Sequence, residues 1–181
     1  MTVRLYDTQA QALRDFAPRD EANVTMYVCG PTVQSGPGIH HLRAALAFDL
    51  WRRWLVRRYG RVTFVRNVTD IDDKVLQNAT PTEPWWALAY RMEREFSAAY
   101  AAIGILPPTY EPRATASIPQ MQELIADLID RGHAYAADGD VYFRVRSYGS
   151  YGKLSGRNIE DLQAGARIEP GEHKEDPLDF A

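Results

Sequence analysis

The sequence is poor in cysteine, in long apolar runs and in net charge. Its 181 residues contain one cysteine, Cys29, which excludes a disulfide framework within the chain and suits a reducing compartment. No stretch approaches the roughly 18 consecutive apolar residues of a membrane span, and the first residues lack the apolar run of a signal peptide. The net charge of -3 favours neither a nucleic-acid coat nor a disordered acidic tail. We therefore expect a cytoplasmic protein with no membrane partner.

What the sequence does contain is enough apolar residues to bury a core. With 45% hydrophobic residues, a chain of this length fits one domain, or one domain with a small appendage. Residues 24–29 (VTMYVC) predict a buried strand that ends at Gly30 and Pro31. Apolar residues at spacings of three and four predict an amphipathic helix over residues 39–59. Residues 61–68 (RVTFVRNV) predict a second strand, so that a βαβ unit with a parallel sheet and a right-handed crossover results.

Further elements follow this unit along the chain. A proline in the first turn predicts a helix over residues 84–104. Ser117 is the predicted N-cap of a helix that runs to Arg131. The dipeptide Asp138-Gly139 predicts a β-hairpin. From Arg146 onward the composition favours loops and short strands.

Arginines are concentrated at the end of the first predicted helix. We interpret them as part of a solvated helix face, with contact to phosphates as the alternative. Five fall within ten residues: Arg52, Arg53, Arg57, Arg58 and Arg61.

Two stretches that carry chemistry stand at the ends of the predicted strands. Residues 29–38 (CGPTVQSGPG) form a glycine-rich turn into a helix, where backbone N–H groups and the helix dipole attract anions. Residues 67–74 (NVTDIDDK) place three carboxylates where they could hold an amine, a ribose or Mg²⁺, and a capping and ion-pair cluster is the alternative. Ligands of parallel sheets bind at the carboxyl ends of the strands. Four residues should lie together there: Cys29, Gly30, Thr69 and Asp70.

Several stretches together carry a resemblance to a known family. They are RLYDT and RDFAP near the N-terminus, MYVCGPTV, AFDLWRRWL, RNVTDIDDK and EPRATASIPQM, followed by GDVYFRV, YGKLSGR and DPLDF. These stretches are similar to the N-terminal part of bacterial cysteinyl-tRNA synthetase, a class I aminoacyl-tRNA synthetase. The resemblance covers nearly the whole chain.

The resemblance implies both a fold and a site. The fold is α/β, with a Rossmann-like parallel sheet over residues 1–110 and a small α+β insertion of helix and hairpin over residues 111–181. The site would bind ATP with Mg²⁺ and cysteine, form cysteinyl adenylate and pass the cysteinyl group to tRNA. It would hold zinc at Cys29, because zinc prefers a thiolate and rejects the hydroxyl of serine. The implied binding residues are Gly30, Pro31, Thr32, Gly38, Thr69 and Asp70.

The start of the first helix departs from the family. Members carry the signature histidine-X-glycine-histidine, and this chain has Gly38, Ile39, His40 and His41, so that only His41 matches. With glycine at position 38, the side-chain donor that the family's first histidine offers to the phosphates is missing. We expect the side chain of His40 to fill the space of the adenine and to weaken ATP binding. A loop shifted by one residue, which presents one of the histidines again, is the alternative. His41 and His40 are the catalytic candidates.

The chain also stops before the family's second nucleotide-fold half, its lysine-rich loop, its tRNA-binding domain and its other zinc ligands. One cysteine does not complete a tetrahedral zinc site, and His133 and His173 have no ligand spacing with Cys29. We therefore expect Cys29 to be an inert, partly buried thiol in an incomplete site.

Three hypotheses for the function follow. The chain is a truncated relative that does not complete adenylation alone and acts as a binding or partner module; or it is the catalytic half of a cysteine-activating ligase that another subunit completes; or it is an excised part of a longer synthetase. We expect a homodimer or a hetero-complex through the exposed edge of the half-sheet. Contact with tRNA would be limited to phosphate attraction that is blind to sequence.

Overall fold

The computed structural model describes residues 3–159 and 173–181, and the chain divides into two compact units. One unit is Pro18–Ile118, and the other combines Met1–Ala17 with Pro119–Ala181. Part of the segment for which we expected loops and short strands, residues 160–172, lies outside the described residues. Among the described residues, none of the helices has the length and apolar character needed to span a membrane.

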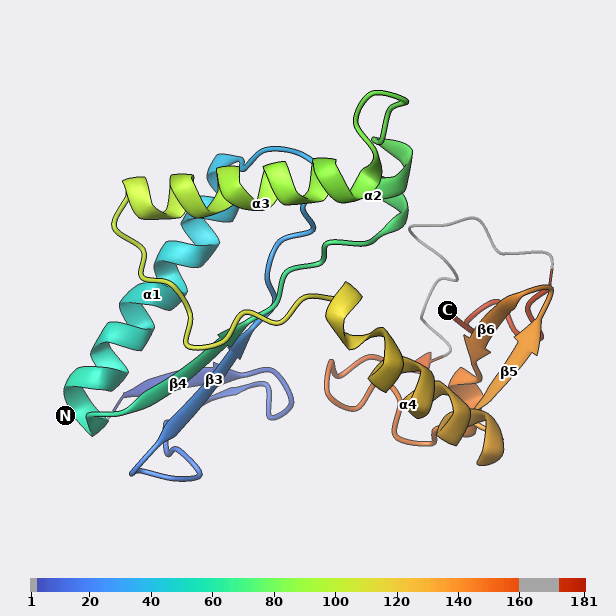
Figure 1. The fold of residues 1–181 in the computed structure, drawn as a ribbon. Coiled ribbons are helices and arrows are strands. Elements are labelled where there is room, and N and C mark those ends of the chain that lie inside the picture. Colours follow the sequence, from blue (N-terminus) through green and yellow to red (C-terminus); the bar gives the residue numbers. More distant parts are fainter. Residues whose placement is uncertain (1–2, 160–172) are drawn as a thin grey trace. The chain divides into compact units, whose positions relative to one another are not determined.

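The unit Pro18–Ile118 is built on a βαβ arrangement (Figure 1). β3 (Val24–Val28) and β4 (Val62–Arg66) pair in parallel, and α1 (Ile39–Tyr59) connects them. Both predicted strands, the helix and the parallel pairing are confirmed. α1 ends at Gly60, whose φ of 88° lies in the left-handed region that favours glycine, and the N–H of Gly60 donates to the carbonyl of Val56 at 2.8 Å.

The core of this unit lies just beyond the carboxyl ends of the two strands. α3 (Trp85–Ala102) crosses the N-terminal end of α1 (Figure 1) and confirms the predicted helix. Its buried side chains repeat at intervals of three and four residues, as one face of a helix requires. They pack against Val33 and Val68, which follow β3 and β4. Each fully buried large apolar side chain contributes about 1.5–3 kcal/mol, so that the segments beyond the strands are held firmly. The buried residues of α3 are Leu88, Ala89, Met92, Phe96 and Tyr100.

A buried carboxylate ties α1 to the loop after α3. Asp49 is 2% exposed. It accepts hydrogen bonds from Nε of Arg53 at 2.7 Å and from the N–H of Leu106 at 3.2 Å. Arg53 and Arg52 also donate to backbone carbonyls of the loop that follows α3. Two of the five clustered arginines therefore hold the helix within its own unit.

The other unit contains two antiparallel hairpins and most of one helix. Asp138 and Gly139 have φ angles of 50° and 89°, as a two-residue turn between twisted strands requires, and the predicted hairpin is confirmed. The predicted helix is confirmed as well, and a 3-10 turn (Thr115–Ser117) precedes it. The N-terminal hairpin was not expected. The elements are β1 (Arg4–Asp7), β2 (Ala12–Asp15), α4 (Ile118–Asp130), β5 (Ala134–Ala137) and β6 (Asp140–Phe143).

Replacing Asp49 with alanine should lower the free energy of unfolding by about 1–3 kcal/mol, because the N–H of Leu106 loses its acceptor. Denaturant unfolding followed by tryptophan fluorescence measures this loss. The matched control is Glu95→Ala, which breaks an ion pair whose partners, Arg91 and Glu95, are 50% and 46% exposed and which should contribute less than about 1 kcal/mol. Equal losses for the two variants would contradict the role given to Asp49.

Candidate functional site

The carboxyl ends of β3 and β4 bring the two chemically notable stretches together. Beyond the strands, Thr32 and Thr69 form a further parallel bridge. The N–H of Val33 donates to the carbonyl of Thr69 at 3.1 Å, and the N–H of Thr69 donates to the carbonyl of Pro31 at 3.0 Å. Pro31 and Val33 are buried. The residues expected at this edge of the sheet therefore lie side by side, and α1 begins a few residues further along.

Gly30 is the point of closest approach between the two segments. A Cβ atom added to Gly30 would lie 1.5 Å from the carbonyl oxygen of Asn67, well inside the contact distance of carbon and oxygen. The N–H of Gly30 donates to Oδ1 of Asn67 at 2.8 Å. Only glycine lets the turn after β3 lie this close to the backbone that follows β4.

Asn67 joins the two strand ends, a role that the sequence pattern did not predict. Its Oδ1 accepts from the N–H of Gly30 and from the hydroxyl of Tyr27 at 3.0 Å, and its Nδ2 donates to Oγ1 of Thr69 at 3.1 Å. Partial desolvation of the hydroxyl, and then the neighbouring Cys29, raise the pKa of Tyr27. One signal in the sequence could have identified this role: Asn67 comes directly after a strand that leads to a predicted site.

Cys29 is exposed, and the expectation of a partly buried thiol is wrong. Side chains alternate between the two faces of a strand, and Cys29 continues the exposed positions of Thr25 and Tyr27, while Val24 is buried on the opposite face. Within the described residues, no three histidine, cysteine, aspartate or glutamate side chains group as metal ligands. These residues do not by themselves fit a zinc centre, so we assign zinc no step.

The two histidines considered with Cys29 have partners of their own. Nδ1 of His133 lies 2.8 Å from Oγ of Ser147. Nε2 of His173 lies 3.1 Å from a carboxylate oxygen of Asp138. Both histidines belong to the unit that contains α4, whereas Cys29 belongs to the unit Pro18–Ile118.

The three carboxylates after β4 have different environments. Asp70 is 9% exposed, and its two oxygens accept from the N–H and the hydroxyl of Thr115 at 3.0 and 2.5 Å. Asp72 caps the short helix α2 (Asp73–Gln77) by accepting from the N–H of Lys74 at 2.9 Å. Asp73 is exposed in the first turn of α2. Asp72 therefore takes the capping role, and Asp70 fastens a distant segment to the end of β4.

At the start of α1, the side chain of His41 reaches back to the backbone of the N-cap residue. Gly38 is the N-cap residue and has no side chain to offer. Nδ1 of His41 accepts from the N–H of Gly38 at 3.0 Å, and the edge of its ring meets Phe96 at a centroid distance of 5.0 Å. Burial, and then the charge of His40, lower the pKa of His41. The neutral ring that accepts at Nδ1 carries its proton on Nε2, which is then a donor.

His40 is exposed and lies against the helix start. Its ring centroid is 3.8 Å from that of His41. A Cβ atom added to Gly38 would lie 2.8 Å from Cε1 of His40. The imidazole of His40 therefore folds back over Gly38.

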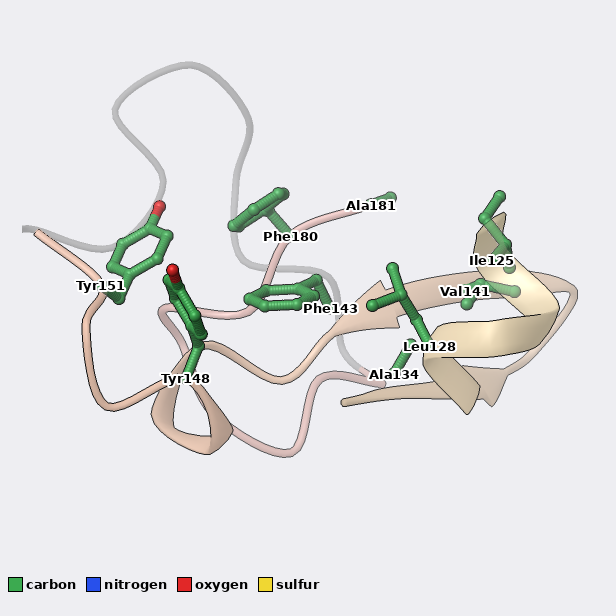
Figure 2. Close-up of a pocket in the computed structure, with 9 residues that line it drawn as sticks. All are labelled: Ile125, Leu128, Ala134, Val141, Phe143, Tyr148, Tyr151, Phe180 and Ala181. Atoms are coloured by element: carbon green, nitrogen blue, oxygen red, sulfur yellow. The ribbon is translucent and has the colours of Figure 1, made fainter. Parts of the chain in front are cut away.

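Among the described residues, each unit also contains an apolar hollow away from the strand ends. The groove along α1 has a volume of about 440 Å³ and is lined by Ile39, Leu42, Arg43, Leu46, Ala47, Leu50 and Ile103. The pocket in the other unit has a volume of about 390 Å³ and is lined by Ile125, Leu128, Ala134, Val141, Phe143, Tyr148, Tyr151, Phe180 and Ala181 (Figure 2). The polar side-chain atoms of this pocket are two tyrosine hydroxyls, whereas the strand ends gather many donors and acceptors. The strand ends are therefore the candidate site.

Comparisons with known proteins show which family the chain resembles. Residues 15–181 match the family model described as tRNA synthetases class I (C) catalytic domain. The cysteine–tRNA ligases of Leifsonia xyli subsp. xyli, Clavibacter michiganensis subsp. michiganensis and Streptomyces coelicolor are 60%, 58% and 53% identical to this chain, and each alignment covers the whole of it. The chain spans 40%, 39% and 30% of the lengths of these relatives.

Gly30→Ala should lower the free energy of unfolding by about 1–3 kcal/mol or more, because the added methyl group overlaps the backbone of Asn67. Denaturant unfolding gives the loss. The control is Gly36→Ala, whose added Cβ would meet only the carboxylate of Glu95, at 3.1 Å, and that flexible side chain can move. A Gly30→Ala protein as stable as the control would show that the strand ends are not held so closely.

The titration of His41 should reveal its surroundings. Since burial and His40 both disfavour the charged ring, the ring proton shifts of His41 should titrate below the ordinary histidine pKa of about 6.5. His40→Ala should move that midpoint upward. The unfolded chain binds the proton more readily, so this group's contribution to stability is complete above about pH 6.5 and falls as the pH drops toward the lowered pKa. A midpoint at or above the ordinary value would contradict the packing described for this ring.

Proposed function

The chain belongs to the family of class I (C) tRNA synthetase catalytic domains, and we propose that it forms the part of a cysteine–tRNA ligase that binds ATP and cysteine. The carrying observation is the meeting of the turn after β3, the segment after β4 and the start of α1 at one edge of a parallel strand pair. Ligands of such sheets bind at this edge. The identity to cysteine–tRNA ligases along the whole chain supports cysteine as the amino acid.

In this proposal, the start of α1 receives the phosphates of ATP. The first N–H groups of a helix have no acceptor within it, and the helix dipole adds positive potential there. Nε2 of His41 adds a neutral donor, because its Nδ1 is already occupied by Gly38. Such donors stabilise the charge that grows on the α-phosphate and on the leaving pyrophosphate. Magnesium bound with the ATP would neutralise part of the phosphate charge.

The reaction that fits these parts is the formation of cysteinyl adenylate. The carboxylate of cysteine attacks the α-phosphate of ATP, the bond to the β-phosphate breaks, and pyrophosphate leaves with the electron pair. Gly30, Thr32 and Thr69 form the floor beside this position, and Asn67 keeps the two strand ends in register. Transfer of the cysteinyl group to tRNA is the second step of the proposed activity.

We also propose that this chain adenylates slowly and does not complete the ligase reaction alone. Gly38 supplies no side-chain donor, and the ring of His40 lies on the surface of the helix start, against His41. In the site that the family resemblance implies, adenine rests at that surface. The adenine must therefore displace the ring of His40 or bind at a shifted position. A homodimer or a hetero-complex remains part of the proposal: among the described residues, β3 is paired on one edge only.

Two measurements test the proposal together. Calorimetric titration with a non-hydrolysable cysteinyl adenylate analogue should show binding, and cysteine-dependent exchange of pyrophosphate into ATP should be slow. His41→Ala should weaken binding of the analogue by about tenfold, the effect of losing one hydrogen bond to a charged group, roughly 1.4 kcal/mol. His173→Ala, in the other unit, is the matched histidine control and should bind as the parent does.

The outcomes separate the two parts of the proposal. If the folded chain does not bind the analogue, the proposed site is wrong. Rapid exchange catalysed by the chain alone would leave the site in place and refute slow adenylation.

A further inference from the structure

Positions 38 and 40 compete for the same space. A Cβ atom on residue 38 would lie 2.8 Å from Cε1 and 2.9 Å from Nδ1 of His40, and 3.8 Å from Nδ1 of His41. Real Cβ atoms essentially never approach other atoms within 3.0 Å. Residue 38 therefore carries no side chain while the ring of His40 keeps this position.

The backbone gives no other reason for glycine at position 38. Its φ of −96° and ψ of 167° are extended angles that any residue adopts. Glycine is required elsewhere in the turn by close backbone approach, as at Gly30, but at Gly38 the nearest atoms are those of the two imidazoles. Glycine at position 38 therefore gives the ring of His40 its present room, although this ring is the far end of a flexible side chain and can move.

The ring of His40 places an imidazole beside position 38, which itself carries no side chain. The ring of His40 lies where the side chain of residue 38 would begin, beside the N-cap of α1 and against the ring of His41. His40 is exposed as a residue and lies beside the N-cap of α1, where an anion at the helix start would come within its reach. The Cβ of residue 40, however, now stands on the helix surface where a glycine would have left the backbone open.

On the basis of the proposed function, we propose that His40 is a specificity-determining residue of the nucleotide site. Its imidazole contacts the triphosphate in place of a side chain at position 38, and its bulk keeps the base from lying on the helix start. The site then selects for the polyphosphate and not for adenine. Nucleoside triphosphates with different bases, and inorganic triphosphate, are bound with similar affinity.

Calorimetric titrations of the full chain with ATP, GTP and inorganic triphosphate test this inference. The three affinities should agree within about threefold, which corresponds to less than 1 kcal/mol. His40→Ala should weaken all three by about fivefold to tenfold, the loss of one hydrogen bond to a charged group. The double variant Gly38→His with His40→Gly should prefer ATP to the other two by about tenfold or more.

A second set of variants tests the pairing itself. Gly38→Ala should push the ring of His40 away and weaken the binding of inorganic triphosphate as much as His40→Ala does. The two changes combined should be no worse than either alone, because both remove the same contact. The loss of nuclear Overhauser contacts between the ring of His40 and the α-protons of residue 38 would report the displacement. Gly149→Ala, in the other unit, is the control: its added Cβ would meet no atom within 4 Å, and it should leave the binding unchanged.

Failure of this inference differs from failure of the proposed function. Strong preference of the parent chain for ATP, or unchanged triphosphate binding by His40→Ala, overturns the role of His40 and leaves the nucleotide site standing. Absence of binding for all three ligands overturns both.

Discussion

The contact between Gly30 and the backbone of Asn67 is the constraint on which the site depends. Because no Cβ separates them, the turn after β3 and the segment after β4 run close enough to extend the parallel pairing to Thr32 and Thr69. Asn67 then satisfies the N–H of Gly30 with its side chain. Chemistry at this edge needs donors held in fixed positions, and here backbone geometry fixes them before any ligand is present.

The hydrophobic core also holds the turn after β3 and the segment after β4 in place. Val33 and Val68 are fully buried against α3, although the residues that face outward from the same segments remain available to a ligand. Asp70 extends the arrangement by accepting two hydrogen bonds from Thr115. These segments are packed against the core on one side and open on the other. This arrangement is expected of a rigid binding edge in an α/β protein.

The sequence predicted those elements whose signals are local. Branched and aromatic residues identified β3, and the apolar spacing gave α1 with both ends correct, because Gly60 stops the helix. The hairpin at Asp138-Gly139 followed from turn chemistry. The N-terminal hairpin was not predicted, because the residue with a positive φ in its turn is Gln11. Glutamine does not mark such a turn in the sequence. The role of Asn67 was not predicted either, because it depends on contacts with Tyr27 and Gly30, about 40 residues away. The exposure of Cys29 follows from the alternation of strand faces, which the expectation of a partly buried thiol did not take into account.

The start of α1 shows why a signature cannot be judged one position at a time. Compared residue by residue, Gly38 lacks a donor and His40 adds an obstruction, so that both changes count as losses. In space the two are one change, because the ring of His40 takes the volume that a glycine at 38 leaves free. The hydrogen bond that His41 accepts at Nδ1 does not depend on the exchange, because residue 38 takes part in it only through its backbone N–H. In the proposed site, a donor for the phosphates and open space for the base are separate requirements, and our proposal is that the exchange keeps the first and gives up the second.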